Sequence, residues 1–396
     1  MGVIFMEIGG LMSPLTPRER VLAVLNHEVP DRVPIVIGAD LTTGIQERAY
    51  RRLTTYLGLP QEYQPLYDWP ELGAPLPAEA VLERLHSDVR GIQDRFPAET
   101  YARNRSRPPG SPYVDDWGVG QPEIEPGVYF PAIHPLKDTQ RVEDLEIYPW
   151  PDMHDPTRFA HLRAEAERLA AENRFAIIGA PWLMSPLERA FQLQGMQAFL
   201  LNLVDAPDFA AALLRKITDL CKTHLTHFLG EVGEYLDLII LADDLGTQNS
   251  LLISPRTYRT LLKPLHAELF ALVRQHSRAR IFFHSDGDVF PLLDDLVEIG
   301  MQVLNPIQTT AGRMANLQEL KQRYGERLVF CGAIDTQRVL PFGTVEEVRA
   351  EVKRVIEILG AGGGYLLSSV HTIPNETPPE NILAMVDAAL ELAQYG

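Results

Sequence analysis

The sequence is poor in cysteine and in long apolar runs, and each shortage excludes a class of protein. Its 396 residues include two cysteines, Cys221 and Cys331, which cannot form a disulfide framework and are typical of a reducing compartment, so we expect a cytoplasmic protein. No stretch approaches the roughly 18 apolar residues that a membrane-spanning helix needs, so we expect no membrane association. The start, MGVIFMEIGGLM, lacks the basic region of a signal peptide.

Positive charge is scarce as well. The 36 Lys and Arg residues stand against 53 Asp and Glu residues, which gives a formal charge of −17. A large nucleic-acid interface requires a basic face, so we expect no nucleic-acid partner. A polyanionic substrate held by a local cluster of arginines remains compatible with this composition.

What the sequence does contain is an alternation of short apolar runs with helix-length segments. Predicted strands lie at residues 33–37, 175–179, 236–241, 280–283, 303–304, 328–330 and 365–367. Strands that alternate with helices are typical of βα units and a parallel sheet. An open sheet that binds a dinucleotide should carry a glycine-rich turn after its first strand, and the sequence has none. We therefore predict an α/β protein with a closed (β/α)8 TIM barrel, in which residues 1–396 form one domain.

One long segment, residues 57–150, does not follow this alternation. It is rich in Pro, Trp and Tyr, and we interpret it as an excursion of loops and a hairpin laid over the barrel. Because about seven strands can be counted elsewhere, we expect the eighth within this excursion. After it, residues 156–172 are predicted to form a helix, and the periodic stretch 190–229 two or three helices.

Polar and ionisable residues follow nearly every predicted strand, where the active sites of such barrels lie. These candidates are Asp40, Trp182, Asp243, Asp244, His284, Asp286, Asn305, Gln308, Cys331 and His371.

His284 and Asp286 form the sharpest pair, because residues i and i+2 leaving a strand point to the same side. With His371 and one of Asp243 or Asp244 they make a nitrogen and oxygen ligand set that suits zinc or a similar divalent metal. The alternative is a hydrogen-bonded His–Asp network without a metal.

The other candidates are expected to bind substrate. We predict that Trp182 forms a wall of the pocket, and that Asp40 is either a residue of the barrel mouth or a helix cap. Asn305 and Gln308 are polar residues at one strand end. Cys331 has either a direct role or a place in the core, where small buried cysteines are common.

Five segments carry a further signal. They are residues 16–25 with 30–34, GAPW at 179–182, residues 284–308, CGAIDT at 331–336 and HTIPNETPPEN at 371–381. In this order they resemble uroporphyrinogen-decarboxylase-like proteins, especially the corrinoid-linked methyltransferase branch. The resemblance covers nearly the whole chain and implies a (β/α)8 barrel independently of the strand count.

The resemblance implies one of two chemistries. Uroporphyrinogen decarboxylases use no cofactor and hold their carboxylate-rich substrate with an arginine-rich segment. The corresponding residues 35–44 contain no Arg here, and residues 183–191 lack the expected Tyr, although His371 matches a histidine of the decarboxylases. The methyltransferase branch binds zinc through a His-x-Cys motif and a later Cys. Its ligand positions correspond to His284, Asp286 and His371, so Asp and His replace both thiolates.

We therefore predict a metal-dependent methyltransferase that moves a methyl group between a small donor, such as a methoxylated compound, and a corrinoid. A harder ligand set suits the polarisation of an ether or phenol oxygen. Asp243 or Asp244 would complete the metal shell or orient a ligand histidine. The corrinoid would be carried by a separate small partner protein. The alternatives are a cofactor-free uroporphyrinogen decarboxylase of porphyrin biosynthesis and a non-catalytic barrel.

Overall fold

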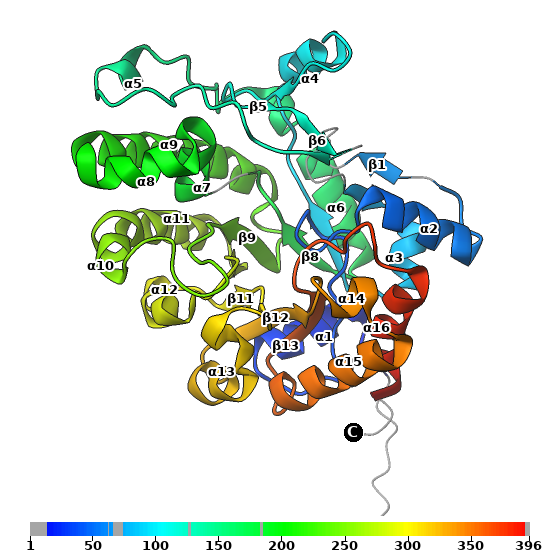
Figure 1. Cartoon of the computed structure of the whole chain (residues 1–396). Helices are drawn as coiled ribbons and strands as arrows, with labels where there is room; N and C mark the ends of the chain where they lie inside the picture. Colours follow the sequence, from blue (N-terminus) through cyan, green and yellow to red (C-terminus); the bar gives the residue numbers. More distant parts are fainter. Residues whose placement is uncertain (1–13, 62, 66–73, 126–127, 183–184, 393–396) are drawn as a thin grey trace, which may run out of the picture.

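A curled sheet of seven parallel strands forms the centre of the computed structural model, which describes residues 14–61, 63–65, 74–125, 128–182 and 185–392 (Figure 1). The start MGVIFMEIGGLM, interpreted above, lies outside the described residues. In spatial order the strands are β13 (Tyr365–Ser369), β12 (Val329–Ile334), β11 (Val303–Asn305), β10 (Arg280–His284), β9 (Leu238–Ala242), β8 (Ala176–Gly179) and β3 (Val89–Ile92).

Residues 33–39 connect the two edges of this sheet. Ile35 pairs in parallel with Leu367 of β13, and its carbonyl accepts a hydrogen bond of 2.8 Å from the amide of Asp88, next to β3. A Cβ at Gly91 of β3 would lie 1.7 Å from the Ala39 carbonyl oxygen, so only glycine permits this approach. The predicted (β/α)8 barrel is confirmed, and its eighth strand, β3, lies within residues 57–150 as expected.

Helices cover the outside of the sheet, and along the chain they alternate with its strands as βα units (Figure 1). The predicted helix at 156–172 is α6 (Leu162–Glu172), preceded by a 3-10 turn (Pro156–Arg158), and the stretch 190–229 spans three helices. These three are α7 (Pro186–Gln194), α8 (Met196–Asp205) and α9 (Pro207–Val232). The later ones are α10 (Pro255–Thr257), a π turn (Tyr258–Leu262), α11 (Lys263–His276), α12 (Leu293–Ile299), α13 (Leu317–Tyr324), α14 (Val339–Phe342), α15 (Val345–Leu359) and α16 (Pro379–Leu392).

The amino-terminal part adds short elements around the barrel. Its helices are α1 (Pro17–Leu25), α2 (Glu47–Leu57), α3 (Glu79–Arg84), α4 (Ala98–Arg105) and α5 (Asp144–Ile147). Three antiparallel pairs join β1 (Tyr63–Pro65) to β2 (Pro75–Pro77), β4 (Tyr113–Val114) to β5 (Gly120–Gln121) and β6 (Glu123–Glu125) to β7 (Val128–Tyr129). In Figure 1, α4, β5 and α5 lie at the top of the view, above the level of α8 and α9.

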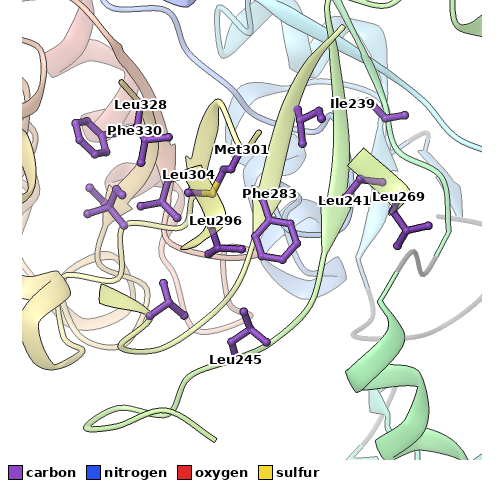
Figure 2. Packing of buried hydrophobic residues seen from close by; sticks show 14 of the residues in the cluster. Ile239, Leu241, Leu245, Leu269, Phe283, Leu296, Met301, Leu304, Leu328 and Phe330 are labelled. Carbon is purple, nitrogen blue, oxygen red and sulfur yellow. The ribbon is translucent and has the colours of Figure 1, made fainter. Parts of the chain in front are cut away.

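Two apolar layers follow from the two-residue period of the strands. Ile239, Leu241 and Phe283 belong to the large cluster between strands and helices, where Leu269 of α11 and Leu296 of α12 also pack (Figure 2). The alternate strand residues fill the interior of the barrel, together with residues of α1 that close its amino-terminal end. This interior cluster includes Val21, Val24, Val36, Val89, Ala176, Leu238, Ile240, Phe282, Val303, Val329, Cys331 and Leu366.

The described helices also bear on membrane association. None of them combines the length and the apolarity that crossing a bilayer demands.

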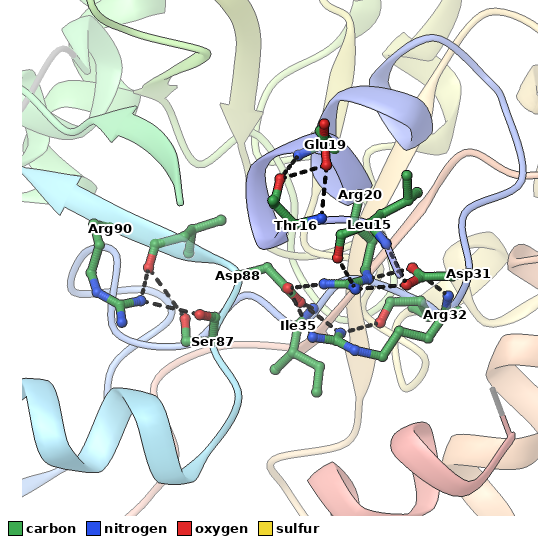
Figure 3. A network of polar contacts seen from close by, with 12 residues as sticks. Leu15, Thr16, Glu19, Arg20, Asp31, Arg32, Ile35, Ser87, Asp88 and Arg90 are labelled. Atoms are coloured by element: carbon green, nitrogen blue, oxygen red, sulfur yellow. Dashed lines mark hydrogen bonds and ion pairs between the residues drawn. The ribbon is translucent and has the colours of Figure 1, made fainter. Parts of the chain in front are cut away.

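A buried carboxylate holds the closing segment in place (Figure 3). Asp88, with no exposed surface, forms ion pairs of 2.7 Å with both Arg20 and Arg32, and its Oδ2 accepts the amide of Ile35 at 2.7 Å. Arg20 also pairs with Asp31 at 2.6 Å. Because each charge in this network has a partner, burial of the group is offset by direct hydrogen bonds.

Replacement of Asp88 by alanine should therefore destabilise the protein strongly. It leaves Arg32 without its carboxylate partner, Arg20 with Asp31 alone, and the Ile35 amide without its acceptor. We expect a loss of about 3–5 kcal/mol in the free energy of unfolding. Urea unfolding measures this loss. Glu172→Ala, which breaks an exposed pair with Arg168 one turn away, is the control and should cost about 0.5 kcal/mol or less. A similar cost for both variants would contradict the closing role of Asp88.

Candidate metal centre and its cavity

A cavity of about 710 Å³ opens where the strands end. Asp40, Ala180, Ala242 and His284 bring four of these strand ends to its surface. Apolar and aromatic groups make up most of the remaining wall, including Phe130, Pro181, Trp182, Phe191, Met196, Ile240 and Leu252. Such a concave, mostly apolar space with a few convergent polar groups is typical of a small-molecule site.

Three ligand-type side chains converge at the edge of this cavity. One ligand atom each of His284, Asp286 and His371 lies within 4.8 Å of the other two. His284 is the last residue of β10, Asp286 follows it by two positions, and His371 follows the end of β13 by two positions. The two imidazole rings lie 5.4 Å apart at an angle of 65°. The spacing is compatible with one cation among the three side chains.

Asn305, the last residue of β11, sets the orientation of His284. The Nδ1–H of His284 donates to Oδ1 of Asn305 at 2.6 Å, because a neutral ring that meets an amide oxygen must carry its hydrogen on that nitrogen. The other ring nitrogen, Nε2, lies 3.9 Å from Oδ1 of Asp286. The amide nitrogen of Asn305 donates to the Cys331 carbonyl at 3.4 Å. Nε2 is therefore the atom that can bind a cation.

The charges around the three residues favour a cation. Burial lowers the pKa of His284, but the carboxylates of Asp286 and Asp244 outweigh this effect and raise it. For the carboxyl groups of Asp286 and Asp244, burial disfavours the charged form and so raises the pKa. Burial, together with the neighbouring His284, lowers the pKa of His371 to about 4, so this ring is neutral at pH 7. Among the described residues, the buried Oδ1 of Asp286 has no hydrogen-bond partner. The residues present thus fit a divalent metal.

The adjacent residues Asp243 and Asp244 have different surroundings in the structure. Asp244 lines the cavity, and its Oδ1 accepts the amide of Asp286 at 2.8 Å. Asp243 is fully buried, and its carboxylate accepts the amides of Leu187 and Glu188 at the start of α7. It also pairs with Nε2 of His266 at 2.9 Å. Asp243 thus caps a helix, whereas Asp244 is placed to act at the centre.

Of the remaining candidates, some line the cavity and others hold the surrounding backbone. Asp40 lines the cavity and accepts the amide and hydroxyl of Thr43 in a tight turn, and Trp182 lines it with its ring 5.4 Å from that of Phe96. Gln308 instead accepts the Gly287 amide at 2.7 Å and so holds the loop that carries Asp286.

Cys331 belongs to the barrel interior. It has no exposed surface, and burial raises the pKa of its thiol. A thiol without exposed surface meets no substrate in the cavity, so the structure favours the core alternative over a direct role.

A family model for uroporphyrinogen decarboxylase (URO-D) matches residues 121–392. The chain belongs to the uroporphyrinogen decarboxylase family. Relatives include uroporphyrinogen decarboxylases of Methylibium petroleiphilum, 26% identical over 277 residues, and of Coxiella burnetii (strain Dugway 5J108-111), 23% identical over 267 residues. Each alignment covers 64% of this chain and 68% of the relative. The resemblance to this family is confirmed.

A solved structure of the same architecture is a methyltransferase from Methanosarcina mazei. It aligns with a TM-score of 0.66 and 21% identity, covering 96% of this chain and 100% of the other. At this identity the likeness shows a shared fold.

This member of the uroporphyrinogen decarboxylase family also lines its cavity with residues that the sequence analysis did not select. Ser185, Glu188 and Gln192 come from α7 and the residue before it, and His134 comes from the amino-terminal excursion. Their positions i, i+3 and i+7 place the first three on one helix face. That spacing could have grouped them, but no sequence feature indicates which face of α7 meets the cavity.

The pH dependence of the two histidines follows from their surroundings. In metal-free protein we expect His371 to titrate near pH 4 and His284 above its ordinary value of 6.5. A proton on His284 must leave before Nε2 binds a cation, so metal affinity should fall as the pH falls through the raised pKa of His284. His371 remains neutral above about pH 5 and adds no dependence there.

NMR titration of histidine-labelled protein measures both values, with His284→Ala and His371→Ala to assign the signals. Zinc affinity measured over the same pH series should follow the His284 titration. A His371 ring that titrates above His284 would contradict this description of the centre.

Proposed function

We propose that this chain is a metal-dependent methyltransferase that moves a methyl group between a small donor and a corrinoid carried by a separate protein. The observation that carries the proposal is the convergence of His284, Asp286 and His371 on an apolar cavity at the barrel mouth. Zinc, or a similar divalent metal, suits two imidazoles and a carboxylate. The donor is a compound such as a methyl ether.

A metal held by these residues would supply Lewis acidity to an oxygen on which negative charge develops. The protein supplies the rest of the arrangement. Asn305 holds His284 in the tautomer that presents Nε2, and Gln308 holds the backbone beside Asp286. The apolar wall around Trp182 lowers the polarity beside the centre, which strengthens the electrostatic contacts there.

Asp244 is the residue that can move a proton. Burial and the nearby Asp286 raise the pKa of Asp244, and its Oδ1 is already occupied by a backbone amide, so Oδ2 is the atom that can carry a proton into the cavity. When the bond between oxygen and methyl breaks, the oxygen keeps the electron pair and the methyl group passes to the corrinoid. Asp244 can then protonate the oxygen.

A small corrinoid-binding protein would reach the methyl group through the open mouth of the barrel, and both proteins would meet in the cytoplasm. The shared fold with a methyltransferase supports this assignment at the level of architecture. The replacement of thiolates by Asp286 and His371 favours an oxygen-bound donor over thiol activation.

Uroporphyrinogen decarboxylation is the second candidate, because the curated relatives carry that name. A substrate rich in carboxylates needs basic side chains to neutralise it. Among the described residues that line the cavity, none is Lys or Arg. The cavity therefore supports the methyl-transfer assignment better.

The metal assignment predicts about one equivalent of divalent metal after zinc-replete purification. His284→Ala, Asp286→Ala and His371→Ala should each abolish stoichiometric binding. Asn305→Leu should weaken zinc affinity by about 10–100-fold through the freed imidazole. The control is His276→Ala, an exposed histidine of α11. Plasma emission spectrometry and competition with a chelator measure both quantities. Less than about a tenth of an equivalent in the parent protein would rule out the metal mechanism.

If the proposed reaction is right, the protein should methylate free cob(I)alamin with 4-methoxybenzyl alcohol as the donor. The loss of cob(I)alamin absorbance measures this reaction. Asp244→Asn should lower the rate by about 10–100-fold and leave the metal content unchanged, because only the transferable proton is lost. Incubation with uroporphyrinogen should give no coproporphyrinogen. Formation of that product would favour the decarboxylase.

A further inference from the structure

The charged groups around the cavity have one sign. Asp40, Glu188 and Asp244 line it, and among the described lining residues there is no Lys or Arg. All 36 Lys and Arg residues of the chain lie within the described ranges, so every basic side chain has been placed. A divalent cation contributes two positive charges. Even with Asp244 protonated, as in the proposed reaction, Asp40, Glu188 and Asp286 contribute three negative charges. The cavity therefore remains negative when the metal is bound.

The basic residue next to Glu188 in the sequence is engaged elsewhere. Arg189 follows Glu188 on α7, but its guanidinium is fully buried and pairs with Asp115 at 2.7 Å. It also lies over the ring of Trp117, 4.7 Å from the ring centroid. Because a buried pair is costly to separate, Arg189 is not available to neutralise the cavity.

Two further features of the wall suit a cation. The Ser185 hydroxyl is buried at the cavity and has no hydrogen-bond partner among the described residues, so its oxygen can accept a hydrogen bond from an occupant. Trp182, Phe191 and Phe130 present aromatic side chains to the same space, and aromatic faces attract ammonium groups.

We propose that the methyl donor is positively charged, a small compound that carries an ammonium group as well as the methyl group to be transferred. The ammonium group lies at the α7 wall, near Glu188 and Ser185, while the methyl-bearing atom faces His284 and His371. This inference rests on the proposed function, because it assigns the substrate class of the same cavity. Selection against carboxylates follows from the same charges.

Three probes of nearly equal size test the charge directly. They are 4-methoxybenzylamine, a cation at neutral pH, the uncharged 4-methoxybenzyl alcohol, and the anion 4-methoxybenzoate. Calorimetry on the zinc-loaded full chain should give an affinity for the amine at least about tenfold higher than for the alcohol, and a benzoate affinity at least about tenfold lower.

Glu188→Gln keeps the shape of the side chain and removes one charge. It should lower the affinity for the amine by about five- to tenfold and leave that for the alcohol unchanged. The matched control is Glu346→Gln, at an exposed position in the first turn of α15, which should change none of the three affinities.

Failure of the amine to bind more tightly than the benzoate, including binding of neither, overturns the inference. An amine preference that survives in Glu188→Gln overturns the role of this carboxylate. Metal content measured on the same samples distinguishes a failure of the charge inference from a failure of the proposed function. Zinc-loaded protein that prefers the benzoate contradicts the charge inference alone, whereas protein that takes up no metal contradicts the proposed function.

Discussion

The pairing of Asp88 with two arginines is the interaction on which the candidate centre depends. It anchors residues 33–39 between the edges of the sheet, and these residues lead directly to Asp40. They also pair with β13, which ends just before His371. Closure therefore brings Asp40 and His371 to the same mouth as His284. His284 ends β10, which lies three strands away from β13 in the sheet. Without closure, residues so distant in sequence would have no common cavity.

Strand register then decides the chemistry within the mouth. β10 and β11 pair so that His284 lies opposite Asn305, and the hydrogen bond that orients the imidazole follows from this alignment. A shift of one of these strands by one residue would turn its side chain to the other face of the sheet and break the pair. The ends of β9 and β10 carry Asp244 and Asp286 into a partly buried region, where uncompensated carboxylates are costly. A proton or a cation must offset that cost, which is why the centre suits a metal.

The sequence could predict what depends on apolar runs and their ends. The strand before His284 stops abruptly, so the direction of His284 and Asp286 follows from spacing alone. The sequence did not locate β3, because Arg90 and Gly91 interrupt its apolar pattern. The structure shows that Arg90 pairs with Glu79 and that Gly91 allows the Ala39 backbone to approach β3 closely. Asp243 and Asp244 are adjacent, so composition cannot tell a helix cap from a cavity residue. Loop and helix contributions such as Ser185 depend on how α7 packs.

Membership of the family and the chemistry of the cavity are separate questions, because a (β/α)8 barrel holds its reacting groups on a few strand ends and loops. The fold is maintained by the apolar layers, which meet the cavity at residues such as Ala180, Ile240 and Phe191, and by the Asp88 network, whose residues do not line it. Under the proposed function, substrate charge is instead set by side chains of the cavity wall such as Glu188. A cavity with carboxylates on its wall and its neighbouring arginine withdrawn to Asp115 opposes polyanions. A barrel of this family can thus be suited to the positively charged donor that we propose.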